Sequence, residues 1–183
     1  MFGFAIGLTS GLLAFSFVEY ALHRWGGHGS RKGVLAHAVQ KHLHHHSQPT
    51  YFPGTHQRIG VAMAGVICAI VWPLAGPGAA IGLALGVVGG LFWFEYVHRS
   101  MHNRTKPPRT PYGRWVAQLH LHHHFVNAKT NHGITSPLWD WLLFTYESPK
   151  KVVVPDRPGL SPRWLLDNPL GPELTARFGV RGR

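Results

Sequence analysis

Histidine dominates the residues of this sequence that could do chemistry. The chain has 15 histidines among 183 residues, and ten of them form two matched sets of five. In each set, a spaced pair precedes a His-x-x-His-His box. The first set is His23, His28, His42, His45 and His46, and the second is His98, His102, His120, His123 and His124. Because the pattern occurs twice, each time directly after an apolar stretch, chance placement of surface histidines is a poor explanation.

The spacing predicts how these rings point. In a helix, residues i, i+3 and i+4 share a face, so each box is expected to aim three imidazoles at one point. His44 and His122, the remaining histidine of each box, are expected to point away. His23 and His28 are five residues apart with two glycines between them. We therefore expect the helix to end at those glycines and the chain to curl back.

Ten imidazoles are too many for one metal ion, since zinc takes four ligands or fewer from protein. They suit two ions with about five nitrogens each and room for a small ligand. Imidazole binds zinc, copper, iron and nickel alike, so the ligand type does not decide the metal. Glu19 and Glu95 each lie three or four residues before the first histidine of a set. We expect them to accept the free ring N–H of a ligand, or else to pair with Arg24 and Arg99.

Long stretches without charge predict membrane-spanning helices, each of which needs ~20 apolar residues. No charged residue occurs from Phe2 to Val18 or from Ile59 to Phe94. Pro73, Gly76, Pro77 and Gly78 interrupt the second stretch, and such residues end helices. The sequence therefore predicts about three spans, near 2–20, 59–75 and 79–97. A cleaved signal peptide is the alternative for the first, although that segment lacks a basic start.

All 18 Lys and Arg residues fall on one side of these spans, and the formal net charge is +11. The positive-inside rule places that side in the cytoplasm. The basic residues are spread through loops without a nucleic-acid-binding module. We therefore expect them to lie beside the anionic lipid headgroups of the membrane, and we expect no nucleic-acid partner.

A single cysteine, Cys68, excludes a disulfide scaffold and thiolate metal sites. The predicted fold is all-α: an integral membrane protein whose cytoplasmic helical cap holds a histidine-rich di-metal site.

Several motifs occur in an order that resembles a known family. Glu19-Tyr20-x-x-His23-Arg24, the first box, Glu95-x-x-His98-x-x-x-His102 and the second box follow one another. Asn131-His132-Gly133-Ile134-Thr135-Ser136-x-x-Trp139-Asp140 then resembles an N-aromatic-G-x-T-S…W-D tail. From about Ser10 to Tyr146, the chain thus resembles the fatty acid hydroxylase / sterol desaturase superfamily, and most of all its fatty acid 2-hydroxylase branch. His132 replaces the usual aromatic, so His132 and Asp140 are candidate extra ligands, and His132 a candidate substrate contact.

The resemblance implies an O2-dependent di-iron monooxygenase that oxidises a C–H bond of a fatty-acyl or related lipid chain, with 2-hydroxylation as the first expectation. Zinc occurs in purified members of the superfamily. The resemblance also implies a lipid substrate and, since no haem-cytochrome domain is seen, a separate electron-transfer protein. We expect residues 1–147 to form the membrane domain and 148–183 a basic, Pro-rich tail. A bacterial inner membrane is the expected location.

Other functions remain open at this stage. A desaturase, a sterol-methyl oxidase or a carotenoid hydroxylase of the same superfamily would share the histidine pattern. A non-catalytic metal-binding membrane protein is the alternative from another class, but a metal carrier needs polar groups along its pathway, and Ile59–Phe94 contains no histidine. A metal-dependent hydrolase is disfavoured because no HExxH-like pattern with a carboxylate base occurs.

Overall fold

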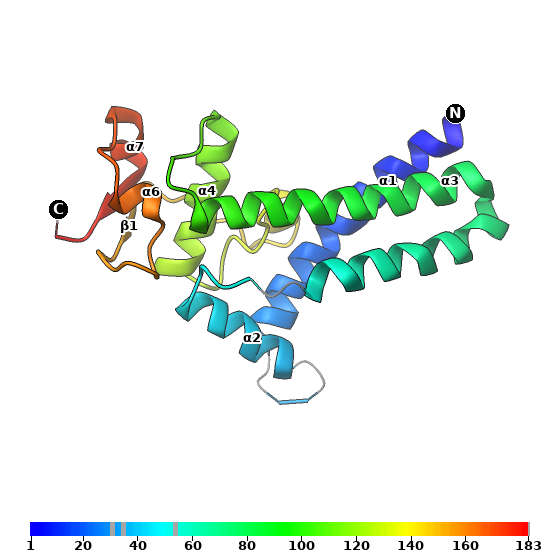
Figure 1. Ribbon diagram of the computed structural model, residues 1–183, viewed down its shortest axis with the longest axis horizontal. Coiled ribbons are helices and arrows are strands. Elements are labelled where there is room, and N and C mark those ends of the chain that lie inside the picture. Colours follow the sequence, from blue (N-terminus) through cyan, green and yellow to red (C-terminus); the bar gives the residue numbers. More distant parts are fainter. Residues whose placement is uncertain (30–31, 34–35, 53–54, 183) are drawn as a thin grey trace. The chain divides into compact units, whose positions relative to one another are not determined.

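The computed structural model describes residues 1–29, 32–33, 36–52 and 55–182, with side chains of 55–60 left out. Helices dominate it (Figure 1), which confirms the all-α prediction. The helices are α1 (Phe2–Ala21), a π-helix η1 (Leu22–Gly27), α2 (Ala36–Ser47), α3 (Thr55–Asn103), α4 (Pro111–Phe125), α5 (Leu138–Leu142), α6 (Arg163–Leu166) and α7 (Pro172–Arg177). Two short strands, β1 (Val152–Val154) and β2 (Phe178–Val180), pair in parallel.

The chain divides into two compact units: Met1–Glu19 with Pro53–Tyr96, and Tyr20–Phe52 with Val97–Arg183.

Within the first unit, α3 folds back on itself (Figure 1). The helix is broken at Gly76, where φ is 80° and ψ is 167°. A side chain is disfavoured at such a φ, which glycine adopts without cost. Pro73 and Pro77 flank this residue within the same helix. The interruption predicted from Pro and Gly is therefore confirmed at Gly76.

Glycines allow α1 and the second arm of α3 to pack backbone against backbone. A Cβ built on Gly7 would lie 2.2 Å from the carbonyl oxygen of Ala79, and one on Gly82 would lie 2.3 Å from that of Phe4. Equivalent overlaps occur at Gly11 and Gly86. In lipid, where the hydrophobic effect does not drive helices together, small residues at the interface permit this close van der Waals contact.

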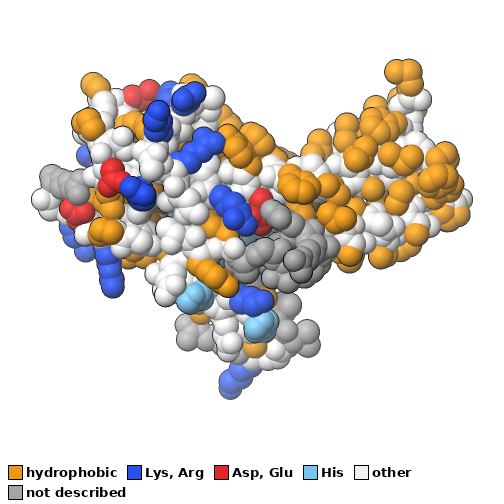
Figure 2. Space-filling view, viewed as in Figure 1, with side chains coloured by type: hydrophobic (Ala, Val, Ile, Leu, Met, Phe, Trp, Pro, Cys, Tyr) orange, Lys and Arg blue, Asp and Glu red, His pale blue; other side chains and the backbone are white. Residues whose placement is uncertain are grey.

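Two helical stretches are long and apolar enough to cross a membrane: Phe2–Gly27 and Val61–Asn103. Only 17% and 11% of their most apolar windows are buried, unlike the core helix of a soluble protein. On the face shown in Figure 2, many hydrophobic side chains are exposed over α1 and the α3 hairpin. The second stretch has 43 residues, and ~20 suffice for one crossing. The sequence predicted three spans, but only two helices meet the length and hydropathy criterion. The reason is that both arms of α3 are counted as one helix. The fold is that of a helical membrane protein.

The second unit has a core of its own around α4 and the end of the chain. Trp164 is completely buried, and its ring meets that of Phe178 edge-on at 5.1 Å. The indole Nε1–H of Trp164 donates to the carbonyl oxygen of Met101 at 3.0 Å. Thr110 caps α4 by accepting a hydrogen bond from the backbone N–H of Gly113. Residues 148–182 are thus packed into the unit that carries the histidines.

Candidate metal centre

The ten histidines of the two sequence repeats come together as two clusters of five. Cluster A consists of His23, His28, His42, His46 and His123, and cluster B of His45, His98, His102, His120 and His124. In each cluster, one ring nitrogen from every residue lies within 4.8 Å of the other four. All ten belong to the second unit. This partition into five and five matches the number of ligands per ion expected from the sequence.

Each His-x-x-His-His box divides between the clusters. His42 and His46 face cluster A, whereas His45 faces cluster B. The second box mirrors this arrangement, with His120 and His124 in cluster B and His123 in cluster A. The expectation that a box aims three rings at one point is therefore wrong. At about 100° per residue, positions i+3 and i+4 lie roughly 60° and 40° to opposite sides of position i, so the second and third rings diverge.

The spaced pair of the first repeat lies on a π-helix. The backbone N–H of His28 donates to the carbonyl oxygen of His23 at 3.2 Å, an i to i+5 bond. The expectation that the helix ends at the two glycines is confirmed, because η1 ends at Gly27, but the spacing did not reveal that this last turn is π-helical. The wider π turn, which often occurs at functional sites, brings two histidines five residues apart into one cluster. A Cβ on Gly27 would lie only 2.7 Å from the ring of His42.

The spacing of the nitrogens fits a bound cation. In cluster A, the Nε2 atoms of His46 and His42, of His42 and His28, and of His28 and His123 are each 2.9 Å apart. In cluster B, the corresponding distances are 3.0 Å for His45 with His98 and 2.8 Å for His102 with His120. Two ligands at right angles, each roughly 2.05 Å from an ion, lie about 2.9 Å apart, whereas tetrahedral ligands lie about 3.4 Å apart. The observed spacing therefore fits ligands at right angles about an ion better than tetrahedral ligands.

Hydrogen bonding among the rings cannot account for cluster A. The Nδ1–H of His123 donates to the carbonyl oxygen of Thr130 at 2.7 Å, so its Nε2 carries a lone pair. If the Nε2 of His28 donates its single proton to His123, it has neither a proton nor a lone pair for His42. A cation at the centre satisfies all of these nitrogens at once.

Both clusters contain buried ring nitrogens without a hydrogen-bond partner among the described residues: Nε2 of His23 in cluster A, and Nδ1 of His102, Nδ1 of His120 and both ring nitrogens of His124 in cluster B. The Nδ1 of His23 donates to the carbonyl oxygen of His132 at 2.5 Å, which leaves a bare lone pair on its Nε2. Both ring nitrogens of His124 are buried and unpaired within the described part of the chain, so the neutral ring has one bare lone pair. Leaving such atoms unsatisfied costs about 1–3 kcal/mol each. The donor set and these two lone pairs therefore fit a metal ion in each cluster.

The electrostatic environment keeps the rings in the form that binds metal. Burial, with repulsion from neighbouring histidines as a smaller cause, lowers the pKa of His120 and His124 well below the ordinary histidine value. Burial and the nearby rings lower the pKa of His46 to about 3. These imidazoles are neutral at pH 7, and neutral imidazole is the metal ligand.

Asp140, on α5, lies in neither cluster of the described residues. Its buried carboxylate accepts hydrogen bonds from the backbone N–H groups of His132 and Gly133, each at 2.8 Å, and from the Thr145 hydroxyl at 2.7 Å. Burial raises the pKa of Asp140, and these hydrogen bonds oppose the increase. The carboxylate therefore anchors the loop whose His132 carbonyl holds the ring of His23.

The hydroxyl groups of Tyr20 and Thr145 extend this anchor, a role that the sequence motifs did not indicate. Arg24 donates to the Tyr20 hydroxyl at 2.7 Å. Because the Thr145 hydroxyl donates to Asp140, it accepts from the Tyr20 hydroxyl, 2.9 Å away. The Glu-Tyr pair occurs in both repeats, but Tyr20 is fully buried and Tyr96 is 53% exposed. The repeat alone therefore could not have identified Tyr20.

The structure gives the ring of His23 a partner other than the predicted carboxylate. Glu19 and Glu95 are both buried. The acceptor for the ring N–H of His23, however, is the carbonyl oxygen of His132 and not a carboxylate. For Glu95, the expected role stays a prediction.

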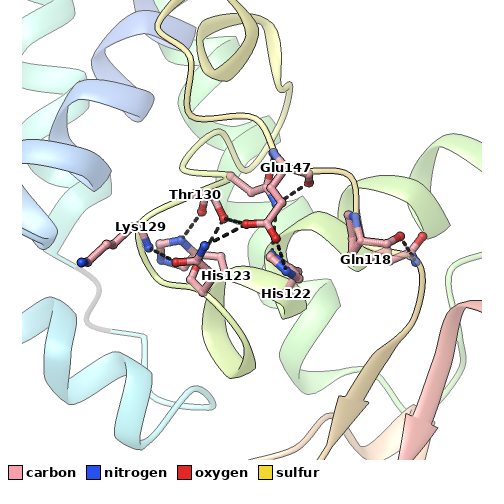
Figure 3. A network of polar contacts seen from close by, with 9 residues as sticks. Gln118, His122, His123, Lys129, Thr130 and Glu147 are labelled. Carbon is pink, nitrogen blue, oxygen red and sulfur yellow. Dashed lines mark hydrogen bonds and ion pairs between the residues drawn. The ribbon is translucent and has the colours of Figure 1, made fainter.

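A polar network supports His123 from outside cluster A (Figure 3). One carboxylate oxygen of Glu147 accepts from the amide of Asn127 at 2.8 Å and from the hydroxyl of Thr130 at 3.2 Å. The other lies 3.5 Å from Nε2 of His122. His122 thus contacts Glu147 and belongs to neither cluster, and exposed His44 also lies outside both.

A helical membrane protein with paired five-histidine clusters is the class of protein that this fold and site define. The sequence profile of the fatty acid hydroxylase family matches residues 8–145. The chain belongs to the fatty acid hydroxylase family.

Named relatives lie within this family. The chain is 29% identical over 141 residues to dihydroceramide fatty acyl 2-hydroxylase FAH2 of Arabidopsis thaliana, covering 71% of this chain and 56% of that protein. It is 29% identical over 150 residues to ceramide very long chain fatty acid hydroxylase SCS7 of Saccharomyces cerevisiae, covering 76% of this chain and 37% of that protein. The chain therefore spans only about one to two thirds of the length of these relatives.

A solved structure shares the fold. It is described as full-length scs7p with only the hydroxylase domain visible, and the TM-score is 0.61 at 24% sequence identity. The similarity covers 82% of this chain and 58% of that one. It supports the all-α membrane fold of the chain.

Proposed function

We propose that this protein is an O2-dependent di-iron hydroxylase that oxidises a C–H bond of a fatty-acyl or related lipid chain, with 2-hydroxylation as its first expected reaction. The observation that carries the proposal is the pair of clusters, in each of which five imidazole nitrogens lie close enough together to share one cation. Relatives named as fatty acid or ceramide 2-hydroxylases support the choice of reaction.

Clusters A and B would each hold one iron ion, and zinc could take the same positions in purified material. When bound, two irons supply the reductive activation of O2 that the oxidation of an unactivated C–H bond requires. The residues of the chain position the ligand rings and determine which ring nitrogen carries the proton. The carbonyl oxygens of Thr130 and His132 hold the Nδ1–H groups of His123 and His23, so each ring presents Nε2 to its cluster. Such outer contacts orient metal ligands.

The remaining partners follow from the same proposal. A lipid would reach the site from the bilayer, and a separate electron-transfer protein would supply electrons. The basic loops would face the cytoplasm, with a bacterial inner membrane as the expected location. We further propose residues 1–147 as the membrane domain and 148–183 as its C-terminal tail.

A lipid mass profile of cells that express the chain tests this function. The control is His120→Ala/His123→Ala, which removes one ring from each cluster, and His44→Ala is the matched variant outside both. A lipid that gains one oxygen with the wild type and His44→Ala, but not with the double variant, is the expected result. With 18O2, the added oxygen should carry the label.

Other outcomes are equally informative. Loss of two hydrogens without added oxygen would replace the hydroxylase with a desaturase of the same superfamily. Fewer than two metal ions per purified wild-type chain would contradict the di-metal site. An added oxygen that derives from water would contradict the use of O2.

A further inference from the structure

The two clusters have different neighbours. The ring of His132 packs against cluster A, with centroid distances of 5.5 Å to His23, 5.7 Å to His28 and 5.2 Å to His123. The ring of Phe52 packs against cluster B, at 5.2 Å from His45, 5.0 Å from His98 and 6.2 Å from His102. Each flanking ring touches three of the five members of its cluster. A polar ring thus borders one cluster and an apolar ring the other.

The hydrogen bonds of His132 fix its tautomer. Its Nε2 lies 3.2 Å from the carbonyl oxygen of Lys129. A carbonyl can only accept, so the proton of the neutral ring is on Nε2 and the lone pair is on Nδ1. This Nδ1 is fully buried and has no hydrogen-bond partner among the residues that the structure describes. The residue as a whole is only 3% exposed.

The backbone of His132 is held on both sides. Its N–H donates to a carboxylate oxygen of Asp140 at 2.8 Å, and its carbonyl oxygen accepts from Nδ1 of His23. Together with the bond to Lys129, these contacts fix the ring and therefore the direction of its lone pair. A buried acceptor with a fixed direction requires a donor, because an unsatisfied one is costly.

The cation itself offers a source for that donor. The three Nε2–Nε2 distances in cluster A are those of ligands at right angles, and an ion held by five ligands in that geometry would have a sixth position open. Water or a hydroxyl group bound there has a proton to donate. The side chain of Phe52, beside cluster B, has no acceptor for such a proton.

We propose that the two ions are inequivalent: Nδ1 of His132 accepts a hydrogen bond from a water or hydroxyl ligand of the ion in cluster A, whereas Phe52 keeps the matching side of cluster B dry. His132 is thus a positioning residue for an exchangeable ligand at one ion only. This inference rests on the ion-binding part of the proposed function and not on the reaction.

Exchangeable protons near the metal test the inference. The full-length protein is loaded with Zn²⁺ containing a small fraction of Cu²⁺, so that most Cu²⁺ ions have a diamagnetic neighbour. Electron spin-echo spectroscopy in D2O then detects deuterons on a ligand of the Cu²⁺. The wild type should show coupling to a metal-bound water. His132→Phe should lose it, and Phe52→Leu should retain it.

A rescue variant separates hydrogen bonding from packing. His132→Asn keeps a side-chain acceptor and should restore part of the coupling, while metal content stays at two ions per chain in all variants that fold. If His132→Phe does not retain both ions, the comparison rests on His132→Asn and Phe52→Leu. The inference is overturned if the wild type shows no water coupling, or if His132→Phe shows as much as the wild type. Because no lipid or O2 is present, a failed hydroxylase assay does not affect this outcome.

Discussion

At the scale of single residues, neighbouring histidines on one helical turn serve different clusters. His45 faces cluster B, while His46, the next residue, faces cluster A, and exposed His44 faces neither. Each cluster thus takes four nitrogens from its own sequence repeat and one from the other repeat. The internal repeat therefore yields two interlocked sites and not two separate ones.

This interlocking predicts how double substitutions combine. His45→Ala should lower the metal content from two ions per chain towards one, because it removes a ligand from cluster B. Adding His120→Ala, in the same cluster, should cause little further loss, whereas adding His123→Ala should deplete the second ion as well. Elemental analysis of purified protein provides the measurement, with His44→Ala as the control that keeps both ions. Equal losses in the two double variants would refute the assignment.

Gly27 offers a test of how closely the π-helix approaches cluster A. Its Cβ would lie 2.7 Å from the ring of His42, so Gly27→Ala must displace that ring. Overpacking of this kind costs about 1–3 kcal/mol, which corresponds to a loss of roughly 5- to 150-fold in the affinity of the cluster A ion. Chelator competition measures this affinity.

The adjacent glycine provides the control for that experiment. A Cβ on Gly26 would find its nearest neighbour at 3.7 Å, an ordinary contact. Gly26→Ala should therefore leave both affinities close to those of the wild type. A similar weakening in Gly26→Ala and Gly27→Ala would show that the π-helix itself, and not the contact with His42, is sensitive.

At the scale of the elements, the contact between α1 and α3 depends on residues without side chains. Gly7→Leu would force a side chain into the backbone of Ala79, so the helices must separate. Gly65→Leu is a matched control, since a Cβ there meets nothing within 4 Å. We expect Gly7→Leu to lower the melting temperature in detergent by several degrees. The same decrease in Gly65→Leu would contradict the proposed contact.

The sequence predicted the elements better than their fine geometry. The break at Gly76 was visible because glycine and proline act locally on φ and on backbone hydrogen bonding. The ten clustered histidines were visible because residue type and spacing repeat. The π-helix at Leu22–Gly27 was not predictable, since the i to i+5 bond depends on packing that spacing does not encode. The supporting roles of Asp140 and Thr130 were hidden for the same reason, because Asp140 acts through the backbone N–H groups that it accepts from and Thr130 acts through its backbone carbonyl.

At the scale of the whole molecule, the distribution of charge predicts its orientation. In a Cys68→Ser background, Ala75→Cys next to the break in α3 should react with an impermeant maleimide in intact cells. Ser148→Cys, beyond the histidine repeats, should react only after permeabilisation. The three predicted spans would place all 18 basic residues on the side of Ser148, and basic loops tend to stay in the cytoplasm. Labelling of Ser148→Cys in intact cells would reverse the orientation.

Metal removal should affect the stability of the whole second unit. Four separate stretches of the chain supply the ten rings: η1 with His28, α2, the end of α3, and α4. Without cations, converging lone pairs repel one another and the buried nitrogens of His23 and His124 lack partners. An ion present at a hundred times its dissociation constant stabilises the folded state by about 2.7 kcal/mol. We expect chelation to lower the melting temperature by several degrees and added Zn²⁺ to restore it.

The variant His45→Ala/His123→Ala shows whether this stabilisation arises from the clusters. It lacks one ring from each cluster, so its melting temperature should respond little to chelator or Zn²⁺, whereas His44→Ala should respond like the wild type. A metal response that survives in the double variant would locate the stabilising ions elsewhere in the chain. Equal melting temperatures for the loaded and chelated wild type would mean that packing alone holds the four stretches together, because the rings would then need no cation to stay in place.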